Sequence, residues 1–214
     1  MNLLFKAESP RPRSGLPPLA WAAPILAGLV PLLLVPAARA HHLVDITGLA
    51  PTALNGLLGG LAHPVLGPDH LLFLLSLSLV GLRHRLAWVL GLLSFGLLGS
   101  CLGLWLPGLP AAEALVAFSL VVVAMVLLAR WPRILLLPAI AMHGYVLSEA
   151  VLGWTHLPLA SYLIGLMLAQ SLLLLLAVTL LRRITAAMTP AAIRLAGAAL
   201  LGCGAAWTWS ALVG

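Results

Sequence analysis

The chain has 214 residues, of which 63% are hydrophobic and only 7% charged, and its mean hydropathy is +1.15. So few charged side chains cannot cover the surface of a soluble domain of this size, which excludes a water-soluble globular protein. The formal net charge of +6 does not indicate a nucleic-acid-binding protein, because the basic residues are scattered through short loops and form no continuous stripe.

Residues 1–40 have the pattern of a cleavable signal peptide. Three basic residues precede an apolar stretch, and a small-residue sequence, Ala-Arg-Ala, ends at Ala40. Prolines interrupt the apolar stretch, so an uncleaved signal anchor is the alternative. Cleavage after Ala40 leaves residues 41–214 as one transmembrane domain that begins with His41 and His42.

Six apolar segments follow, most of them close to the length that a membrane-spanning helix needs. They cover residues 51–81, 86–106, 113–129, 134–152, 157–181 and 191–213. Every backbone amide in a lipid bilayer needs an internal partner, so segments this rich in Leu and Ala are expected to be helical. The sequence therefore predicts an all-α, polytopic membrane protein with about six transmembrane helices.

The first of these segments is predicted to be broken. It is too long for one crossing and too short for two, and its middle reads HPVLGPDH over residues 63–70. Pro64 and Pro68 remove backbone donors and Gly67 loosens the chain, so the helix is expected to break within this motif. Discontinuous helices in membranes usually line a binding site.

The arginines predict the orientation in the membrane. They mark every second junction between segments, namely Arg83 and Arg85, Arg130 and Arg133, and Arg182, Arg183 and Arg194. The positive-inside rule places these junctions in the cytoplasm. The mature N-terminus is then expected on the external, periplasmic side of the inner membrane, where an exported N-terminus also belongs.

Small residues at four-residue spacing recur within the segments. They are Gly56 and Gly60, Gly99 and Gly103, Ser161, Gly165 and Ala169, and Ala198, Gly202 and Ala206. Such spacing lets two helices approach closely in lipid, so we expect these residues at helix–helix contacts.

Ionisable residues within the apolar segments are the candidates for function, because an intramembrane charge is costly. On the predicted topology they gather toward the external side. The candidate metal ligands are His63, Asp69, His70, His143 and Glu149, with His41, His42 and His156 as weaker candidates. Imidazole together with carboxylate suits a borderline divalent cation such as nickel, cobalt, zinc or copper.

Each candidate also has a purely structural interpretation. Asp69 follows a proline at an expected helix start, where a carboxylate stabilises free amides. His70 and His143 are each able to bond a neighbouring backbone carbonyl. Glu149 lies six residues after His143, roughly 120° around a helix, so the two side chains need not face one point.

The motif at residues 63–70 resembles the signature of the HupE/UreJ family of nickel permeases. A second family pattern, Phe-His-Gly-x-Ala-His-Gly-x-Glu, resembles MHGYVLSEA here: His143 and Gly144 match, Leu147 replaces the second histidine, and Glu149 comes one residue early. The resemblance covers most of the chain. It implies uptake of nickel or cobalt as transported cargo for metalloenzymes such as hydrogenase or urease, with no prosthetic group. The partners expected are the metal ion, the lipid bilayer, and a second copy of the chain or maturation proteins.

Three classes of function are therefore compatible with the sequence. A metal permease explains the outward cluster, and no GxxxxGK[ST] motif is present, so transport would be secondary or would depend on a partner. A membrane metalloenzyme would use the histidines to activate water, but no HExxH pattern supports it. A non-transporting accessory protein for metalloenzyme assembly is the third. The sequence favours the permease, which is not an enzyme.

Overall fold

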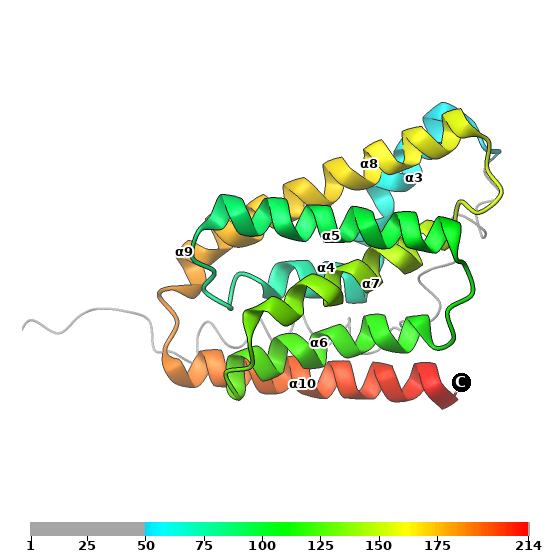
Figure 1. Cartoon of the computed structure of the whole chain (residues 1–214). Helices are drawn as coiled ribbons and strands as arrows, with labels where there is room; N and C mark the ends of the chain where they lie inside the picture. Colours follow the sequence, from blue (N-terminus) through cyan, green and yellow to red (C-terminus); the bar gives the residue numbers. More distant parts are fainter. Residues whose placement is uncertain (1–49, 214) are drawn as a thin grey trace, which may run out of the picture.

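The computed structural model describes residues 50–213, which form helices joined by loops and contain no strand (Figure 1). The predicted signal peptide and the two histidines that follow it lie outside the described residues. The helices, in chain order, are α3 Ala53–Leu66, α4 Pro68–Ser76, α5 Arg85–Trp105, α6 Ala112–Leu128, the 3-10 turn η2 Arg133–Leu135, α7 Leu136–Glu149, α8 His156–Leu175, the π-helix η3 Leu176–Leu181, α9 Arg182–Thr185 and α10 Pro190–Val213.

The first apolar segment breaks where the sequence predicts. α3 ends at Leu66 and α4 begins at Pro68, with Gly67 between them in an extended conformation. Pro68 has no amide hydrogen to continue the ladder and disfavours helical geometry in the residue before it. Pro64, by contrast, is accommodated inside α3. The backbone break therefore comes from the Gly67–Pro68 pair.

Three of the described helices are long and apolar enough to cross a membrane: residues 85–105, 156–185 and 190–213. α3 and α6 are shorter apolar helices of 14 and 17 residues, and α7 has 14. The all-helical fold is thus confirmed for the described residues, with three candidate membrane-spanning helices, while the count of six crossings stays a prediction.

The most extensive helix–helix contacts join helices that are not consecutive in the chain: α3 packs along α8, α5 along α7, and α6 along α10. Glycines allow the first two approaches, since a Cβ on Gly60 would overlap the backbone of α8 and one on Gly99 would overlap the backbone of α7. In α10, the prediction that Ala198, Gly202 and Ala206 form the contact face was wrong. Gly202 has open space around it among the described residues, and Gly197 and Gly204 meet α6 instead.

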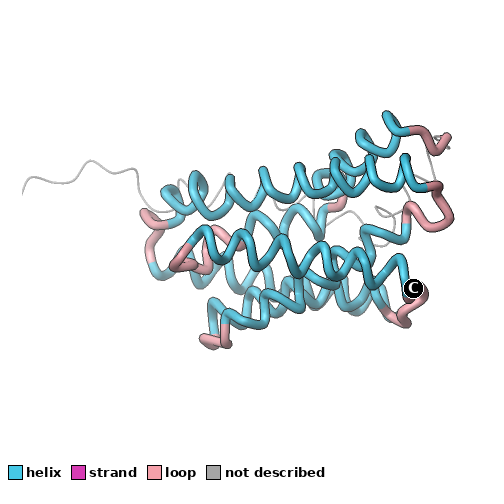
Figure 2. The backbone as a smooth tube through the Cα atoms, turned by 45° about the horizontal axis from the view of Figure 1, so that its top comes forward, coloured by secondary structure: helices cyan, strands magenta, loops and turns pink. Residues whose placement is uncertain are grey.

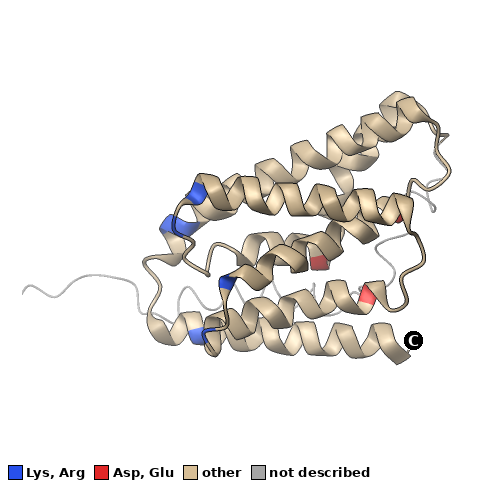
Figure 3. Cartoon of the chain, in the orientation of Figure 1, with Lys and Arg blue, Asp and Glu red and all other residues tan. Residues whose placement is uncertain are grey.

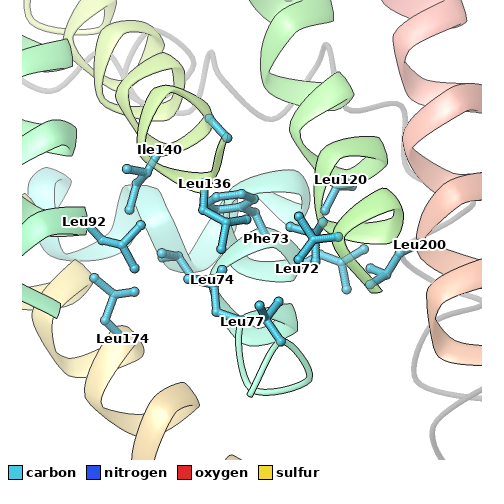
Figure 4. Close-up of a cluster of buried hydrophobic side chains, with 14 of the residues drawn as sticks. Leu72, Phe73, Leu74, Leu77, Leu92, Leu120, Leu136, Ile140, Leu174 and Leu200 are labelled. Atoms are coloured by element: carbon cyan, nitrogen blue, oxygen red, sulfur yellow. The ribbon is translucent and has the colours of Figure 1, made fainter. Parts of the chain in front are cut away.

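The described part of the chain is a bundle of helices joined by short loops (Figure 2). The short helix α4 lies between the other helices of this bundle (Figure 1). Seven of its nine residues are buried, and it contacts α3, α6, α8 and η3. Its apolar side carries Leu72, Phe73 and Leu74 into the main hydrophobic cluster, where side chains from α5, α6, α7, α8 and α10 surround them (Figure 4). The two residues at its N-terminal end that carry polar side chains, Asp69 and His70, are thereby held inside an apolar bundle.

The basic and acidic residues separate along the bundle. The arginine-bearing starts of α5, η2 and α10, together with α9, gather at one end (Figure 3). The carboxylates lie along the middle and toward the other end. The described helices therefore have one positively charged end.

Candidate metal centre

His63 lies in the last turn of α3 and is buried, with 4% of its surface exposed. Its Nδ1 atom is 2.6 Å from the hydroxyl of Tyr162 on α8, and that hydroxyl donates to the carbonyl of Leu147 on α7, also at 2.6 Å. One hydroxyl group therefore links the histidine to two further helices.

Asp69 and His70 stand side by side in the first turn of α4, and both are 1% exposed. The carboxylate oxygen Oδ1 of Asp69 accepts the backbone N–H of His70 at 2.9 Å. A helix N-terminus presents free amides and the positive end of the helix dipole, which stabilises a carboxylate there. Gly67 is required just before them, because a Cβ would lie 2.6 Å from Cδ2 of His70.

His143 comes from the middle of α7 and is 2% exposed. Its Nδ1 atom faces Nδ1 of His70 within hydrogen-bonding distance, and its Nε2 atom is 2.8 Å from Oγ of Ser119 on α6. The ring also stacks on Phe73, with centroids 4.4 Å apart. Two neutral imidazoles in this arrangement share a single proton between their facing nitrogens.

The three imidazoles form one buried group, although they come from three different helices. The ring centroids of His63 and His70 are 6.0 Å apart, and those of His70 and His143 are 4.7 Å apart. Within residues 50–213, no set of three or more His, Cys, Asp or Glu side chains is arranged to hold a metal ion. His70 and His143 bond to one another, so a metal ion that binds both facing nitrogens would have to reorient at least one of these two rings.

The HupE / UreJ protein family model matches residues 29–207, which is most of the chain. The chain belongs to the HupE/UreJ family. No curated protein and no solved structure matches it. The family is associated with the transport of nickel or cobalt, or with the maturation of urease and hydrogenase, and its members are permease-like or accessory proteins.

The HupE/UreJ match includes both motifs that sequence analysis selected, and the structure brings their histidines together. This chain has Leu147 where the second family motif has its second histidine. Leu147 is 1% exposed and packs against Tyr162 and Leu166. The backbone carbonyl of Leu147 accepts the hydroxyl proton of Tyr162.

The remaining sequence-predicted ligands are placed differently. Glu149 is half-buried at the last residue of α7, about 9 Å along the helix axis from His143. His156 is exposed at the first residue of α8. His41 and His42 lie outside the described residues.

Three residues that contact the histidines were not predicted from the sequence: Tyr162, Ser119 and Phe73. All three lie in strongly apolar helices, where no sequence motif around a single hydroxyl or aromatic residue marks it as part of a site. The one available signal was the rarity of tyrosine, since the whole chain has only two.

Proposed function

We propose that this protein transports a divalent transition-metal ion, nickel or cobalt, across the inner membrane, and that His63, Asp69, His70 and His143 receive the ion. The observation that carries the proposal is the burial of three imidazoles and one carboxylate together inside an apolar bundle. A carboxylate at the centre of a membrane helix costs about 2.5–3.5 kcal/mol on insertion scales. Purely structural residues would not gather at that expense.

The chemistry of the donors supports a borderline cation. Imidazole nitrogen and carboxylate oxygen together suit nickel and cobalt, which bind only deprotonated ligands. The facing nitrogens of His70 and His143 share a proton, so for a cation to bind both nitrogens the donating ring must carry its proton on Nε2 instead. Asp69 supplies a negative charge beside His70 that partly offsets the charge of the ion.

The ion leaves chemically unchanged, so the proposal requires no catalytic group. A membrane metalloenzyme is the less favoured alternative, and a non-transporting accessory protein for metalloenzyme assembly is the other. Glu149 and His156, with His41 and His42, are proposed as weaker ligands on the route of entry rather than at the buried group.

The separation of charges along the bundle supports an orientation. The arginine-rich end of the described helices belongs in the cytoplasm by the positive-inside rule (Figure 3). The beginning of α3 and the end of α10 lie at the opposite end (Figure 1). We infer that the ion enters from the external side and passes toward the arginine-rich end.

Metal accumulation in cells tests the proposal. His143→Gln keeps a hydrogen-bonding side chain of moderate size and removes the imidazole, so we expect normal membrane levels and poor uptake of nickel and cobalt. A His63/His143 double replacement should be little worse than either single one, because residues that act as a unit are not additive. His84→Gln is the matched control, since His84 is exposed before α5. Near-normal uptake by His143→Gln at equal protein level contradicts the proposal.

Cells that bind the metal without accumulating it would favour the accessory role. Purified protein that turns over a substrate would favour the metalloenzyme. Uptake that follows protein level across several external concentrations of nickel and cobalt supports the permease.

A further inference from the structure

Among the described residues, Tyr162 is the largest fully buried side chain, and none of its surface is exposed. Its hydroxyl oxygen is 2.6 Å from the carbonyl oxygen of Leu147 and 2.6 Å from Nδ1 of His63. The hydroxyl therefore lies between a group that only accepts hydrogen bonds and a ring nitrogen that is able either to donate or to accept.

Counting protons fixes the direction of both bonds. A tyrosine hydroxyl has one proton, and the carbonyl of Leu147 has none to give, so the hydroxyl proton lies toward Leu147. The hydroxyl oxygen must then accept from His63, which places a proton on Nδ1 of that ring. A neutral His63 with its proton on Nδ1 has its lone pair on Nε2.

We propose that Tyr162 is a positioning residue for metal binding: it holds His63 in the Nδ1–H tautomer and presents Nε2 to a divalent transition-metal ion. The proposal rests on the metal transport proposed above and names a further residue of that site. Histidines that bind metals commonly donate their second N–H to a fixed acceptor, which sets the tautomer and the orientation of the ring. Tyr162 supplies that acceptor to His63.

The fold explains why the hydroxyl group is oriented this way. Leu147 is within the last turn of α7, where a carbonyl no longer accepts the N–H of the residue four positions later. That N–H, on Val151, bonds to the carbonyl of Ser148 instead. The carbonyl of Leu147 is thus available to take the hydroxyl proton. Gly60 allows α3 to lie against α8 at Tyr162, which brings the last turn of α3 within reach of the hydroxyl.

A structural alternative predicts a different outcome, because a hydroxyl that only ties helices together would affect stability and nothing else. Tyr145 is the matched control. Its hydroxyl donates to Leu106 at 2.6 Å and accepts from the N–H of Leu109 at 2.9 Å, so it also joins two groups, neither of which is a histidine. Tyr162→Phe and Tyr145→Phe each remove one buried bridging hydroxyl.

The experiment uses the purified full-length chain in lipid nanodiscs. NMR of protein with isotope-labelled histidine reads the tautomer from the imidazole nitrogen shifts, with His63→Ala to assign the signals. Competition titration measures the affinity for nickel(II) and cobalt(II). We expect the Nδ1–H tautomer at His63 in the wild type, loss of that preference in Tyr162→Phe, and an affinity about 10- to 100-fold weaker. Tyr145→Phe should keep both the tautomer and the affinity.

Two results overturn the role of Tyr162. One is a wild-type His63 whose proton is on Nε2, a measurement that requires neither a variant nor a metal. The other is a Tyr162→Phe protein that binds both ions as tightly as the wild type. Failure of the wild-type protein to bind either ion contradicts the proposed function itself. This failure is distinguishable from failure of the Tyr162 proposal, because the tautomer of His63 is measured without metal.

Discussion

The contact between α3 and α8 at Gly60 provides a test of both packing and function. In Gly60→Ala the added carbon would overlap the carbonyl oxygen of Tyr162 and would lie 2.7 Å from the backbone nitrogen of Leu166. These are main-chain atoms of α8, so no side chain is able to rotate away. The two helices have to separate.

The size of the effect follows from two opposing terms. Overpacking of this kind costs about 1–3 kcal/mol, and contact with the backbone on α8 places it near the upper value. Alanine is favoured over glycine in a helix by about 1 kcal/mol. We therefore expect a net loss of about 2 kcal/mol in the free energy of unfolding. His63 lies three residues further on the same face of α3, so its 2.6 Å contact with Tyr162 lengthens too.

Gly202→Ala is the matched control, because a Cβ there meets nothing within 4 Å among the described residues. It should leave stability unchanged or raise it by up to about 1 kcal/mol. Both proteins are unfolded in the same detergent and followed by tryptophan fluorescence, and their nickel affinities are measured in the folded state. A Gly60→Ala protein as stable as Gly202→Ala would refute the close approach of α3 to α8.

Three further predictions concern the metal and the membrane. Asp69→Asn keeps the oxygen that accepts the amide of the next residue, so we expect normal folding with metal affinity or uptake about 10-fold or more below the wild type. Replacing His41 and His42 by alanine should weaken uptake at scarce metal and much less at saturating metal, because the predicted cleavage after Ala40 would leave a free amine beside two imidazoles, where cations are captured before they reach the buried group. A reporter enzyme fused after Arg133 should be cytoplasmic and one fused after Thr155 external.

Each of these predictions has an opposite outcome that counts against it. Near-normal uptake by Asp69→Asn means that the carboxylate only stabilises the start of α4. Loss of uptake at every metal concentration in the protein without His41 and His42 places that pair in the buried site. A cytoplasmic reporter after Thr155 reverses the proposed direction of entry.

Local sequence signals predict the helices well, because each signal acts within a few residues. The break at Gly67 follows from one proline and its preceding residue, and the predicted boundaries of α5, α6 and α10 lie within one residue of the structure. In α7 the predicted segment begins at residue 134, but the 3-10 turn η2 occupies residues 133–135 and the α-helix starts at Leu136.

Tertiary contacts were harder to predict, because small residues at four-residue spacing do not say which face of a helix meets a partner. Glycine spacing correctly indicated close approaches at Gly60 and Gly99, but it selected Gly202, which faces open space, and missed Gly204. The hydroxyls of Tyr162 and Ser119 were missed for the same reason. Their importance depends on which histidine lies opposite, and that is decided by packing between helices far apart in sequence.

The broken helix is what makes a single buried group possible. In a continuous helix, His63 and His70 would lie on one face about 10.5 Å apart along the axis, too far to share one ion. The Gly67–Pro68 break reduces the separation of their ring centroids to 6.0 Å. The break also starts a new helix, α4, at Pro68. The free amides in the first turn of α4 stabilise the charge of Asp69, which would otherwise be costly inside an apolar bundle. The same two residues therefore bring the imidazoles together and allow a carboxylate to lie beside them.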